Sequence, residues 1–378
     1  MAKLGEVCTI VSGSTPKTSV TSYWDGNIKW ITPAELNENT FYIMDSVRHI
    51  TEEGKEKTGL SYLPTGTVIL SSRAPIGKTA IAGCEMCCNQ GFKNLICSDA
   101  IYNEYLYFFL KSKTDYLNSL GRGATFKEIS KSIVENIEIP LPEVNQQKEI
   151  AEKFKKLEQL ISLRKQQLAK LDELVKARFV EMFGDINVNN KKWMTYPLGE
   201  LCTIVRGGSP RPIERYLGGT IPWIKIGDAT TGENIYLNST KEYIIQEGVK
   251  KSRMIKAGSL IFANCGVSLG FARIITFDGC IHDGWLAMED IDEKLDKIFL
   301  LYSLNQMTEY FRKTAPAGTQ PNLNTNIMKM HRQIVPPMEM QKAFMSFVKC
   351  TDRQKQTVQQ SLEKLELMKK ALIQEYFG

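Results

Sequence analysis

Residues Ser72–Thr79 come nearest to a nucleotide-binding motif, since they read Ser-Arg-Ala-Pro-Ile-Gly-Lys-Thr after an apolar stretch. A P-loop needs glycine at the first of these positions and a helix after the Lys-Thr pair. Ser72 holds the glycine position, 80–83 has the composition of a further strand, and the related stretch 264–271 has no lysine. We therefore predict a tight β-turn that leaves Arg73 and Lys78 to contact DNA phosphates, with an ATP site as the alternative.

Patterns for metal binding and catalysis are weak. Cys84–Cys88 contains one Cys-x-x-Cys pair, but zinc needs four ligands and no second pair follows at finger spacing; Cys97 and His49 would complete the set only if the fold is assumed. His282 and His331 stand apart from any Gly-x-Ser-x-Gly motif, and no Gly-x-Gly-x-x-Gly loop or Asn/Asp-Pro-Pro-Tyr/Phe stretch occurs. We predict no catalytic residue, no metal site and no cofactor bound by this chain.

Polar residues in glycine-containing loops are better candidates, and they suit DNA. Arg, Lys, Asn and Gln can read base edges, while Ser, Thr and backbone amides hold phosphates. Singly each is an ordinary solvated loop residue, but they recur at matched places in both halves of the chain. The predicted DNA-binding residues are Ser14, Thr15, Lys17, Arg73, Lys78, Asn89, Gln90, Lys93, Arg122, Thr125 and Lys127 in the first half, and Arg206, Ser209, Arg211, Arg215, Lys225, Asn264, Thr319, Gln320, Asn322 and Asn324 in the second.

These loops sit on an internal repeat. Short stretches return at an offset that drifts only between 192 and 194 residues, so the duplication covers a whole half of the protein. Between the matched stretches the sequences differ strongly, which indicates one duplicated scaffold with different loops. The matched stretches are Leu4–Val11 with Leu198–Val205, Ile28–Ile31 with Ile221–Ile224, and Leu63–Leu70 with Ile255–Phe262.

Each half ends in a long helical stretch whose apolar positions alternate in steps of three and four residues, the period of paired helices. A helix over 147–183 would be roughly 55 Å long, so we interpret the two stretches as a spacer pair. Further apolar residues beside the seam (Leu160, Leu163, Leu174, Phe179, Leu367, Met368 and Ile373) favour an additional helical partner. Four cations, Arg164, Arg178, Lys355 and Lys369, interrupt the seam. The residues predicted for helix pairing and partner docking are Ile150, Phe154, Leu157, Ile161, Leu168, Leu171, Phe344, Val348, Leu362, Leu365 and Leu372.

Composition sets the remaining bounds. The chain has 378 residues, a net charge of +6, no apolar run of membrane-spanning length and nine scattered cysteines. We expect a cytoplasmic protein with reduced thiols and no membrane contact.

The element pattern predicts an α+β protein. Strands are expected at Val7–Val11, Lys29–Thr32, Thr67–Leu70 and Thr79–Ala82, and a helix at Tyr102–Lys113. A short helix around 127–132 and a strand over 133–139 follow. The predicted divisions are a first globular domain (1–145), a spacer helix (146–184), a linker with a second domain (185–337) and a second spacer helix (338–378).

Taken together, the ordered motifs resemble the specificity (S) subunit of type I restriction-modification systems over the whole chain. The motifs that carry the resemblance are Leu4-Gly5-Glu6, Gly13–Pro16, Trp30–Pro33, Gly66–Leu70, Gly77–Thr79, Ile139–Pro142 and Gln146–Ile150, with Gly207–Pro210, Ile221–Ile224, Pro336-Pro337 and Gln341-Lys342 in the second half.

The resemblance implies two α/β target-recognition domains in pseudo-twofold repeat, separated by two long helices that pair antiparallel. Each domain would read one half of a split, asymmetric site on double-stranded DNA, and the helices would set the spacer. It also implies a non-catalytic subunit that recruits two methyltransferase (M) subunits and, through them, restriction (R) subunits. S-adenosylmethionine, ATP and Mg are expected on those partners. The alternatives are an S-like coiled-coil scaffold that does not read DNA, and an enzyme.

Overall fold

The computed structural model describes residues 1–378 apart from 38, 74, 124–126, 231–234, 267 and 316–321. The chain forms two compact units, which share both long helices. The first unit comprises Met1–Arg164 together with Gln360–Gly378, and the second comprises Lys165–Gln359. The predicted boundaries at 145, 184 and 337 lie close to the ends of the long helices, whereas the compact units divide within these helices. The predicted domains therefore stay a prediction.

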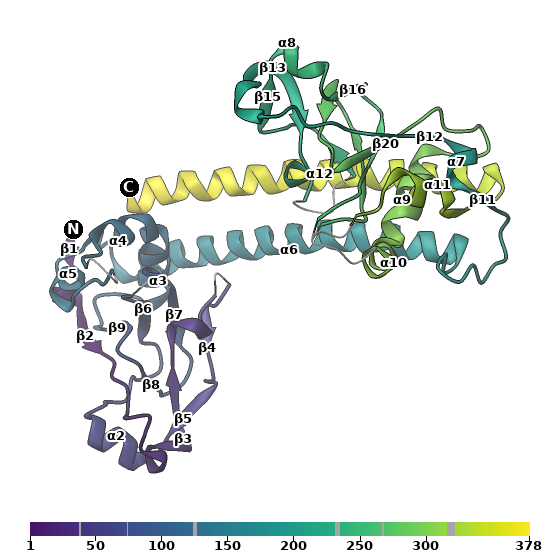
Figure 1. Ribbon diagram of the computed structural model, residues 1–378. Coiled ribbons are helices and arrows are strands. Elements are labelled where there is room, and N and C mark those ends of the chain that lie inside the picture. Colours follow the sequence, from purple (N-terminus) through teal and green to yellow (C-terminus); the bar gives the residue numbers. More distant parts are fainter. Residues whose placement is uncertain (38, 74, 124–126, 231–234, 267, 316–321) are drawn as a thin grey trace. The chain divides into compact units, whose positions relative to one another are not determined.

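The first unit is built on a twisted sheet with strand order β2–β9–β6–β7–β4 (Figure 1). Alternate residues of the buried strand β6 point to opposite faces. Val68 and Leu70 pack with the helices, while Ile69 packs toward the second sheet, β5–β3–β8. The strands are β1 (Ala2–Lys3), β2 (Cys8–Ser12), β3 (Trp24–Ile31), β4 (Tyr42–Ile43), β5 (Arg48–Ile50), β6 (Val68–Ser71), β7 (Thr79–Ala82), β8 (Cys87–Cys88), β9 (Phe92–Cys97) and β10 (Glu138–Ile139).

Helix α3 connects this sheet to the long helices. It contacts β6 and β7, and its Phe108 ring stacks on Phe154 of the first long helix, with 5.4 Å between centroids. The predicted helix over Tyr102–Lys113 is therefore present. The helices of this unit, before the long ones, are α1 (Leu4–Val7), η1 (Thr21–Tyr23), η2 (Pro33–Glu35), α2 (Glu52–Thr58), α3 (Asn103–Ser112), α4 (Thr114–Leu120) and α5 (Lys131–Glu135).

Two local predictions were wrong. The strand expected over 133–139 is mostly helix α5, and only Glu138–Ile139 pair as a strand. The short helix expected around 127–132 starts later, because the Ser130 side chain accepts a hydrogen bond from the Ile133 amide and so caps a helix that begins at Lys131. The run of β-branched and apolar residues in this stretch hid that cap.

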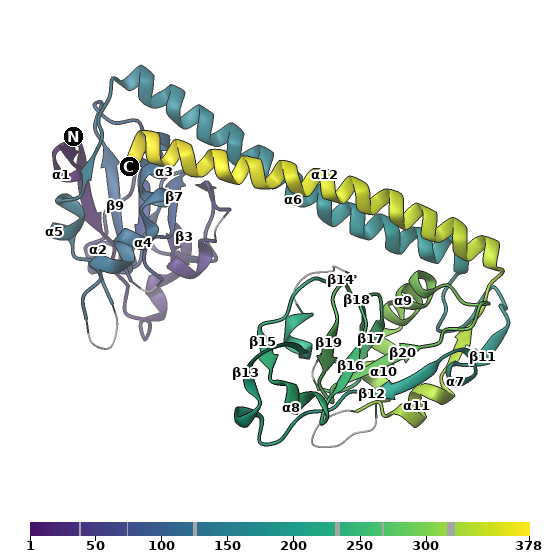
Figure 2. The same ribbon diagram turned by 90° about the horizontal axis from the view of Figure 1, so that it is seen from above.

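The second unit repeats the design with strand orders β12–β20–β17–β18–β14 and β15–β13–β19–β16, and α9 covers the first sheet on the side of the long helices (Figure 2). The strands are β11 (Thr195–Pro197), β12 (Thr203–Arg206), β13 (Leu217–Ile224), β14 (Tyr236–Leu237), β15 (Glu242–Ile244), β16 (Arg253–Ile255), β17 (Leu260–Ala263), β18 (Ala272–Ile275), β19 (Gly279–Ile281), β20 (Trp285–Glu289) and β21 (Arg332–Ile334). The helices are α7 (Leu198–Leu201), η3 (Ile213–Arg215), η4 (Ile226–Asp228), α8 (Gln246–Val249), α9 (Lys297–Gln306), α10 (Thr308–Thr314) and α11 (Thr325–Met330).

The long helices are α6 (Val144–Phe183) and α12 (Met338–Phe377). Each is fastened to the unit that precedes it by a fully buried glutamine in its first turn. Gln147 accepts a hydrogen bond from the Tyr102 amide (2.8 Å) and donates to the carbonyls of Ala100 and Pro142. Gln341 repeats this arrangement with the Asp296 amide (2.8 Å) and two carbonyls. These contacts fix where each helix leaves its globular part.

The two helices pair antiparallel within each unit, as predicted. In the first, Phe154 stacks on Phe377 with centroids 5.3 Å apart. In the second, Phe179 meets Phe344 edge to face at 5.3 Å. All predicted pairing residues are buried or half-buried: Ile150, Phe154, Leu157, Ile161, Leu168, Leu171, Phe344, Val348, Leu362, Leu365 and Leu372.

The seam cations have defined partners. Lys369 donates to Glu158 of the facing helix at 2.7 Å, and Lys355 pairs with Asp172 of the facing helix. Arg164 donates to Ser361 at 3.2 Å, whereas Arg178 pairs along its own helix with Glu181 (2.8 Å). These pairs complement the apolar seam and oppose a slip of one helix along the other, as polar seam residues do in coiled coils.

The apolar residues expected beside the seam divide into two groups. Phe179 was misplaced: it is fully buried with Phe183 and Phe299, because the seam shifts toward it where α9 packs. Ile373 packs against the core of the first unit. Five others keep large exposed fractions, namely Leu160 (45%), Leu163 (50%), Leu174 (48%), Leu367 (68%) and Met368 (55%).

Within the described residues, neither a helix apolar and long enough to cross a bilayer nor a cluster of three or more metal-ligating side chains is found.

Candidate nucleic-acid interface

In the first unit, one end of the main sheet gathers three of the loops that carry predicted DNA-binding residues. Strand β2 ends, β6 ends and β9 begins at this end, because Ser12 pairs with Lys93 and Ser71 pairs with Phe92. The loop after β2 lies tightly on the loop before β9: a Cβ on Gly13 would come within 2.0 Å of the Asn89 carbonyl oxygen. That approach lets the Ser14 amide donate to Cys88 (3.0 Å) and the Thr15 hydroxyl donate to the Gln90 side chain.

A second junction at this end is charged. The Glu128 carboxylate accepts a hydrogen bond from Arg73 Nε at 2.9 Å and another from Lys93 Nζ at 3.2 Å. Lys93 is only 6% exposed, whereas 45% of the Arg73 side chain is exposed. Burial acts to raise the pKa of Glu128, but the hydrogen bonds from Arg73 and Lys93 outweigh it and hold that pKa below its ordinary value. Glu128 is therefore ionised at neutral pH.

Two of the predicted residues are engaged inside the unit. The Lys78 ammonium donates to the carbonyls of Pro33 (3.2 Å), which begins the short helix η2, and Leu36 (2.7 Å), which follows its last residue. The Asn89 side chain accepts from the Gly91 amide at 2.8 Å. Strand β7 follows Lys78 directly, so the turn interpretation of the P-loop-like stretch is confirmed.

The remaining first-half candidates lie at the surface or outside the described residues. Lys17, Arg122 and Lys127 are exposed. The Arg122 main chain pairs with that of Glu128. Thr125 lies outside the described residues.

The corresponding end of the second unit gathers basic residues around one carboxylate. Ser209 donates to Asp283 Oδ1 at 2.6 Å, Arg211 lies 3.7 Å from Oδ2, and Arg206 Nε donates to the Asp283 carbonyl at 2.9 Å. Partial burial would raise the pKa of Asp283, but the Ser209 hydrogen bond and nearby positive charges, including Arg206 and Arg211, lower it. Burial lowers the pKa of the neighbouring His282, which is therefore neutral at pH 7.

The other second-half candidates hold loops in place or face solvent. Asn264 is fully buried and donates to the Asn322 side chain at 3.2 Å. Lys225 pairs with Glu242, and Asn324 caps α11 by accepting from the Ile327 amide at 3.0 Å. Arg215 is exposed. Thr319 and Gln320 lie outside the described residues.

Neither Glu128 nor Asp283 is among the predicted DNA-binding residues, because those residues are mainly hydrogen-bond donors to DNA and both carboxylates are acceptors. A usable signal was present for Glu128, which is an isolated acid in a stretch otherwise rich in cations and glycine, but not for Asp283, which has no Lys or Arg near it in the sequence. Glu128 binds predicted DNA-binding residues of two separate segments, Arg73 and Lys93. Asp283 binds predicted residues of a single segment, the end of β12 and the residues that follow it.

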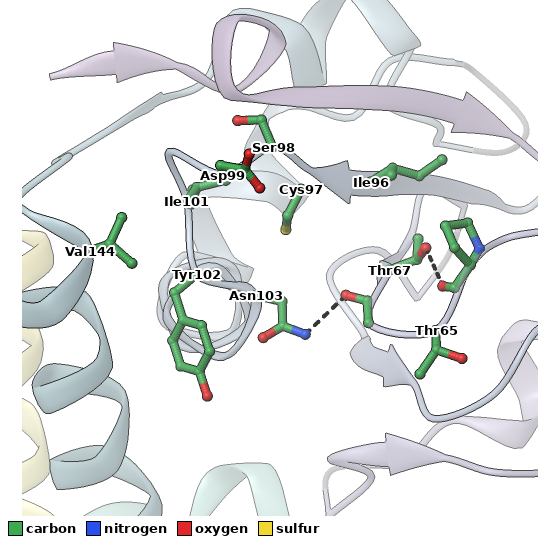
Figure 3. A pocket seen from close by; sticks show the side chains of 12 residues that line it. Thr65, Thr67, Ile96, Cys97, Ser98, Asp99, Ile101, Tyr102, Asn103 and Val144 are labelled. Carbon is green, nitrogen blue, oxygen red and sulfur yellow. Dashed lines mark hydrogen bonds between the residues drawn. The ribbon is translucent and has the colours of Figure 1, made fainter.

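The cavity drawn in Figure 3 belongs to another part of the first unit. It has a volume of about 370 Å³ and lies at the Cys97 end of β9, away from the loops at the Phe92 end. Two of its polar side chains form hydrogen bonds that stabilise the turn before β6. Asn103 Nδ2 donates to the Gly66 carbonyl at 3.1 Å, and Thr67 donates to the Pro64 carbonyl at 2.6 Å. The cavity is not part of the candidate interface.

Comparison with known proteins assigns both halves to one family. The family described as type I restriction modification DNA specificity domain matches residues 1–173 and 190–367. The specificity subunit of the type I restriction enzyme MjaIX from Methanocaldococcus jannaschii is 30% identical over 372 residues, covering 92% of this chain and 85% of that protein.

Two solved structures support the fold. A chain from a structural study of complex assembly and conformational transition of the type I R-M system covers 100% of this chain and 96% of its own length, with a TM-score of 0.67 at 18% identity. The type I restriction-modification S subunit from M. genitalium covers 100% of this chain and 95% of its own, with a TM-score of 0.55 at 16% identity.

Proposed function

We propose a function for this chain on the premise that it belongs to the family of type I restriction-modification specificity subunits. In this proposal, the loops at the end of each main sheet read one half of a bipartite DNA site. The observation that carries it is the pairing of one duplicated scaffold with different loop chemistry. Both halves match the same family, yet Thr15–Gln90 in one is replaced by Ser209–Asp283 in the other. Unequal loops on equal scaffolds read unequal half-sites, so the site is asymmetric.

The long helices are proposed to set the spacer between the half-sites. Each is a continuous helix of 40 residues, about 60 Å at 1.5 Å per residue. The seam contacts Lys369–Glu158 and Lys355–Asp172 pin their register. A change in helix length would therefore be transmitted to the spacing of the recognition loops.

The exposed apolar residues Leu163, Leu174 and Leu367 support a role for the helices in docking methyltransferase subunits, because an isolated helix pair gains nothing from exposing them. Restriction subunits would join through these M subunits. S-adenosylmethionine, ATP and Mg would bind to the partners and not to this chain. The competing proposal, a scaffold that does not read DNA, predicts a complex without sequence preference.

The test exchanges the first recognition segment, residues 1–145, for that of another member of the family, in the full chain together with its methyltransferase partner. The methylated sequence is then determined across a genome. We expect one half-site to change while the other half-site and the spacer are retained. A change in both halves would refute modular reading, and methylation without sequence preference would favour the scaffold.

A further inference from the structure

Glu128 is the meeting point of separate loop segments at the interface of the first unit. Its main chain pairs with Arg122 in both directions, at 2.9 and 3.0 Å. The next residue, Ile129, donates to the Ser72 carbonyl at 2.9 Å. The carboxylate reaches Arg73 after β6 and Lys93 at the start of β9. No other contact described at this interface joins as many of the predicted DNA-binding segments.

The two cations bound by Glu128 have different surroundings. Lys93 lies within a strand, is 6% exposed and is also 3.5 Å from the buried Ser72 hydroxyl. It therefore holds the Glu128 carboxylate from the buried side. Arg73 is the exposed member and donates through Nε. A guanidinium bound at Nε keeps its terminal nitrogens, Nη1 and Nη2, for a bidentate contact such as the O6 and N7 atoms of guanine. Fixing the side chain in advance also lowers the entropy lost on binding.

Charge balance explains how an acid is tolerated beside DNA. Two cations and one carboxylate leave the cluster with one net positive charge (+1 +1 −1), so the carboxylate orients Arg73 without making the surface anionic. An isolated carboxylate here would repel phosphates.

The second unit shows which part of this arrangement belongs to the scaffold. There the Leu323 amide donates to the Asn264 carbonyl at 2.8 Å, as Ile129 does to Ser72. Strand pairing places Cys265 opposite Asn322, as it places Arg73 opposite Glu128. The scaffold thus needs the main-chain junction but neither the acid nor the arginine, so these two residues are available to determine specificity.

We propose that Glu128 is a positioning residue that aims Arg73 at a guanine in the half-site read by the first unit. The inference rests on the proposed function and adds to it one named base contact and the residue that orients it.

The test uses the full chain with its methyltransferase partner and DNA libraries in which one half-site at a time is randomised. Glu128→Gln keeps the shape of the side chain and removes its charge. We expect about a 10-fold loss of discrimination at one G·C pair of the first half-site and an unchanged profile over the second. Glu128→Asp should recover part of that discrimination. In an Arg73→Ala background, Glu128→Gln should have no further effect at that base pair.

Glu56→Gln, the same charge change on the exposed face of α2, serves as the matched control and should leave both profiles unchanged. A uniform loss of methylation on all sequences with an unaltered base profile would overturn the inference, because it would indicate a role in folding alone. Additive effects of Glu128→Gln and Arg73→Ala would overturn it as well. If the wild-type complex had no bipartite preference, the proposed function itself would fail, and this outcome is visible before any variant is compared.

Discussion

The two units hold one corresponding main-chain junction, Ser72 with Ile129 in the first and Asn264 with Leu323 in the second, by different side chains. In the first, Glu128 holds Arg73 and Lys93 by ionic hydrogen bonds. In the second, a neutral contact between Asn264 and Asn322 replaces them, while the main-chain hydrogen bond from Leu323 to Asn264 matches that from Ile129 to Ser72. Since both versions sit on the same scaffold, the fold constrains the backbone of this junction and leaves its side-chain chemistry open. That freedom is what a recognition domain needs in order to change its target without changing its fold.

The largest effect should come from the exposed arginine. Arg73→Ala removes the predicted guanine contact, and we expect a loss of about 10–100-fold in discrimination within the first half-site, from a bidentate contact of about 1–3 kcal/mol. The matched change at the equivalent position, Cys265→Ala, should alter discrimination less than about twofold, because a thiol makes no such contact. Both are measured by methylation of half-site libraries. Equal effects of the two changes would break the comparison between the units.

A smaller effect concerns stability and tests whether the charged junction can be converted to the neutral one. Glu128→Asn leaves the buried Lys93 ammonium without its carboxylate, and we expect a loss of about 2 kcal/mol in unfolding free energy. Lys93 corresponds to Leu286 in the second unit, since each follows the residue paired with the end of the central strand. Adding Lys93→Leu should therefore restore most of the loss.

The unfolding free energies of Glu128→Asn and of the double variant with Lys93→Leu are measured by chemical denaturation, with hydrogen exchange reporting each unit separately. A double variant no more stable than Glu128→Asn alone would show that the two junctions are not interchangeable.

The smallest expected effect is a difference between the two units in how their stability depends on pH. Burial lowers the pKa of His331 in the second unit to about 4. The unfolded chain then binds more protons than the folded chain between pH 6.5 and 4. The contribution of neutral His331 to the unfolding free energy is therefore fully present above that range and is lost as the pH decreases through it. The expected loss is about 1.4 kcal/mol at pH 5.5. His282, whose pKa burial also lowers, adds to the effect with the same sign.

The junction of the first unit should respond at lower pH. The lowered pKa of Glu128 keeps its contribution intact above the ordinary glutamate range and removes it only as the pH falls below that range. Unit-resolved hydrogen exchange from pH 7 to 4 measures the difference. His331→Phe should flatten the response of the second unit, and His49→Gln, in the first unit, should leave it unchanged. Parallel loss of protection in both units would contradict this assignment.

Much of this architecture could be predicted from the sequence because it rests on periodic signals. The seam positions of α6 and α12 repeat every three to four residues, and the duplicated stretches such as Leu4–Val11 and Leu198–Val205 revealed two copies. The start of α5 was missed because a single side chain, Ser130, decides it against the β-branched composition of the stretch. Phe179 was misplaced because its burial depends on α9, which lies more than 100 residues further along the chain.

The candidate interface could be predicted in part. Residue types identified the donors, but not which of them the fold would use internally. Lys78 serves two carbonyls and Lys93 is buried on Glu128, and such assignments depend on distances between segments far apart in sequence. Acceptors such as Asp283 carry no signal when each residue is considered only for its affinity for phosphate or base edges. Roles in DNA contact for the individual residues stay predictions.

The first unit consists of two segments, 1–164 and 360–378, that are separated by the second unit, and this affects the order in which the two cores can form. Phe377 packs against Tyr105, Phe109 and Phe154, with centroids 5.3–5.7 Å apart, so the first core is sealed by a residue that is synthesised after the whole second unit. Residues 165–359, which make up the second unit, are contiguous. At 5–20 residues per second their translation takes roughly 10–40 s. During that time the nascent first unit must stay soluble while the aromatic surface that Phe377 will cover is exposed. The second unit, although it is translated later, is therefore the first that can complete its core.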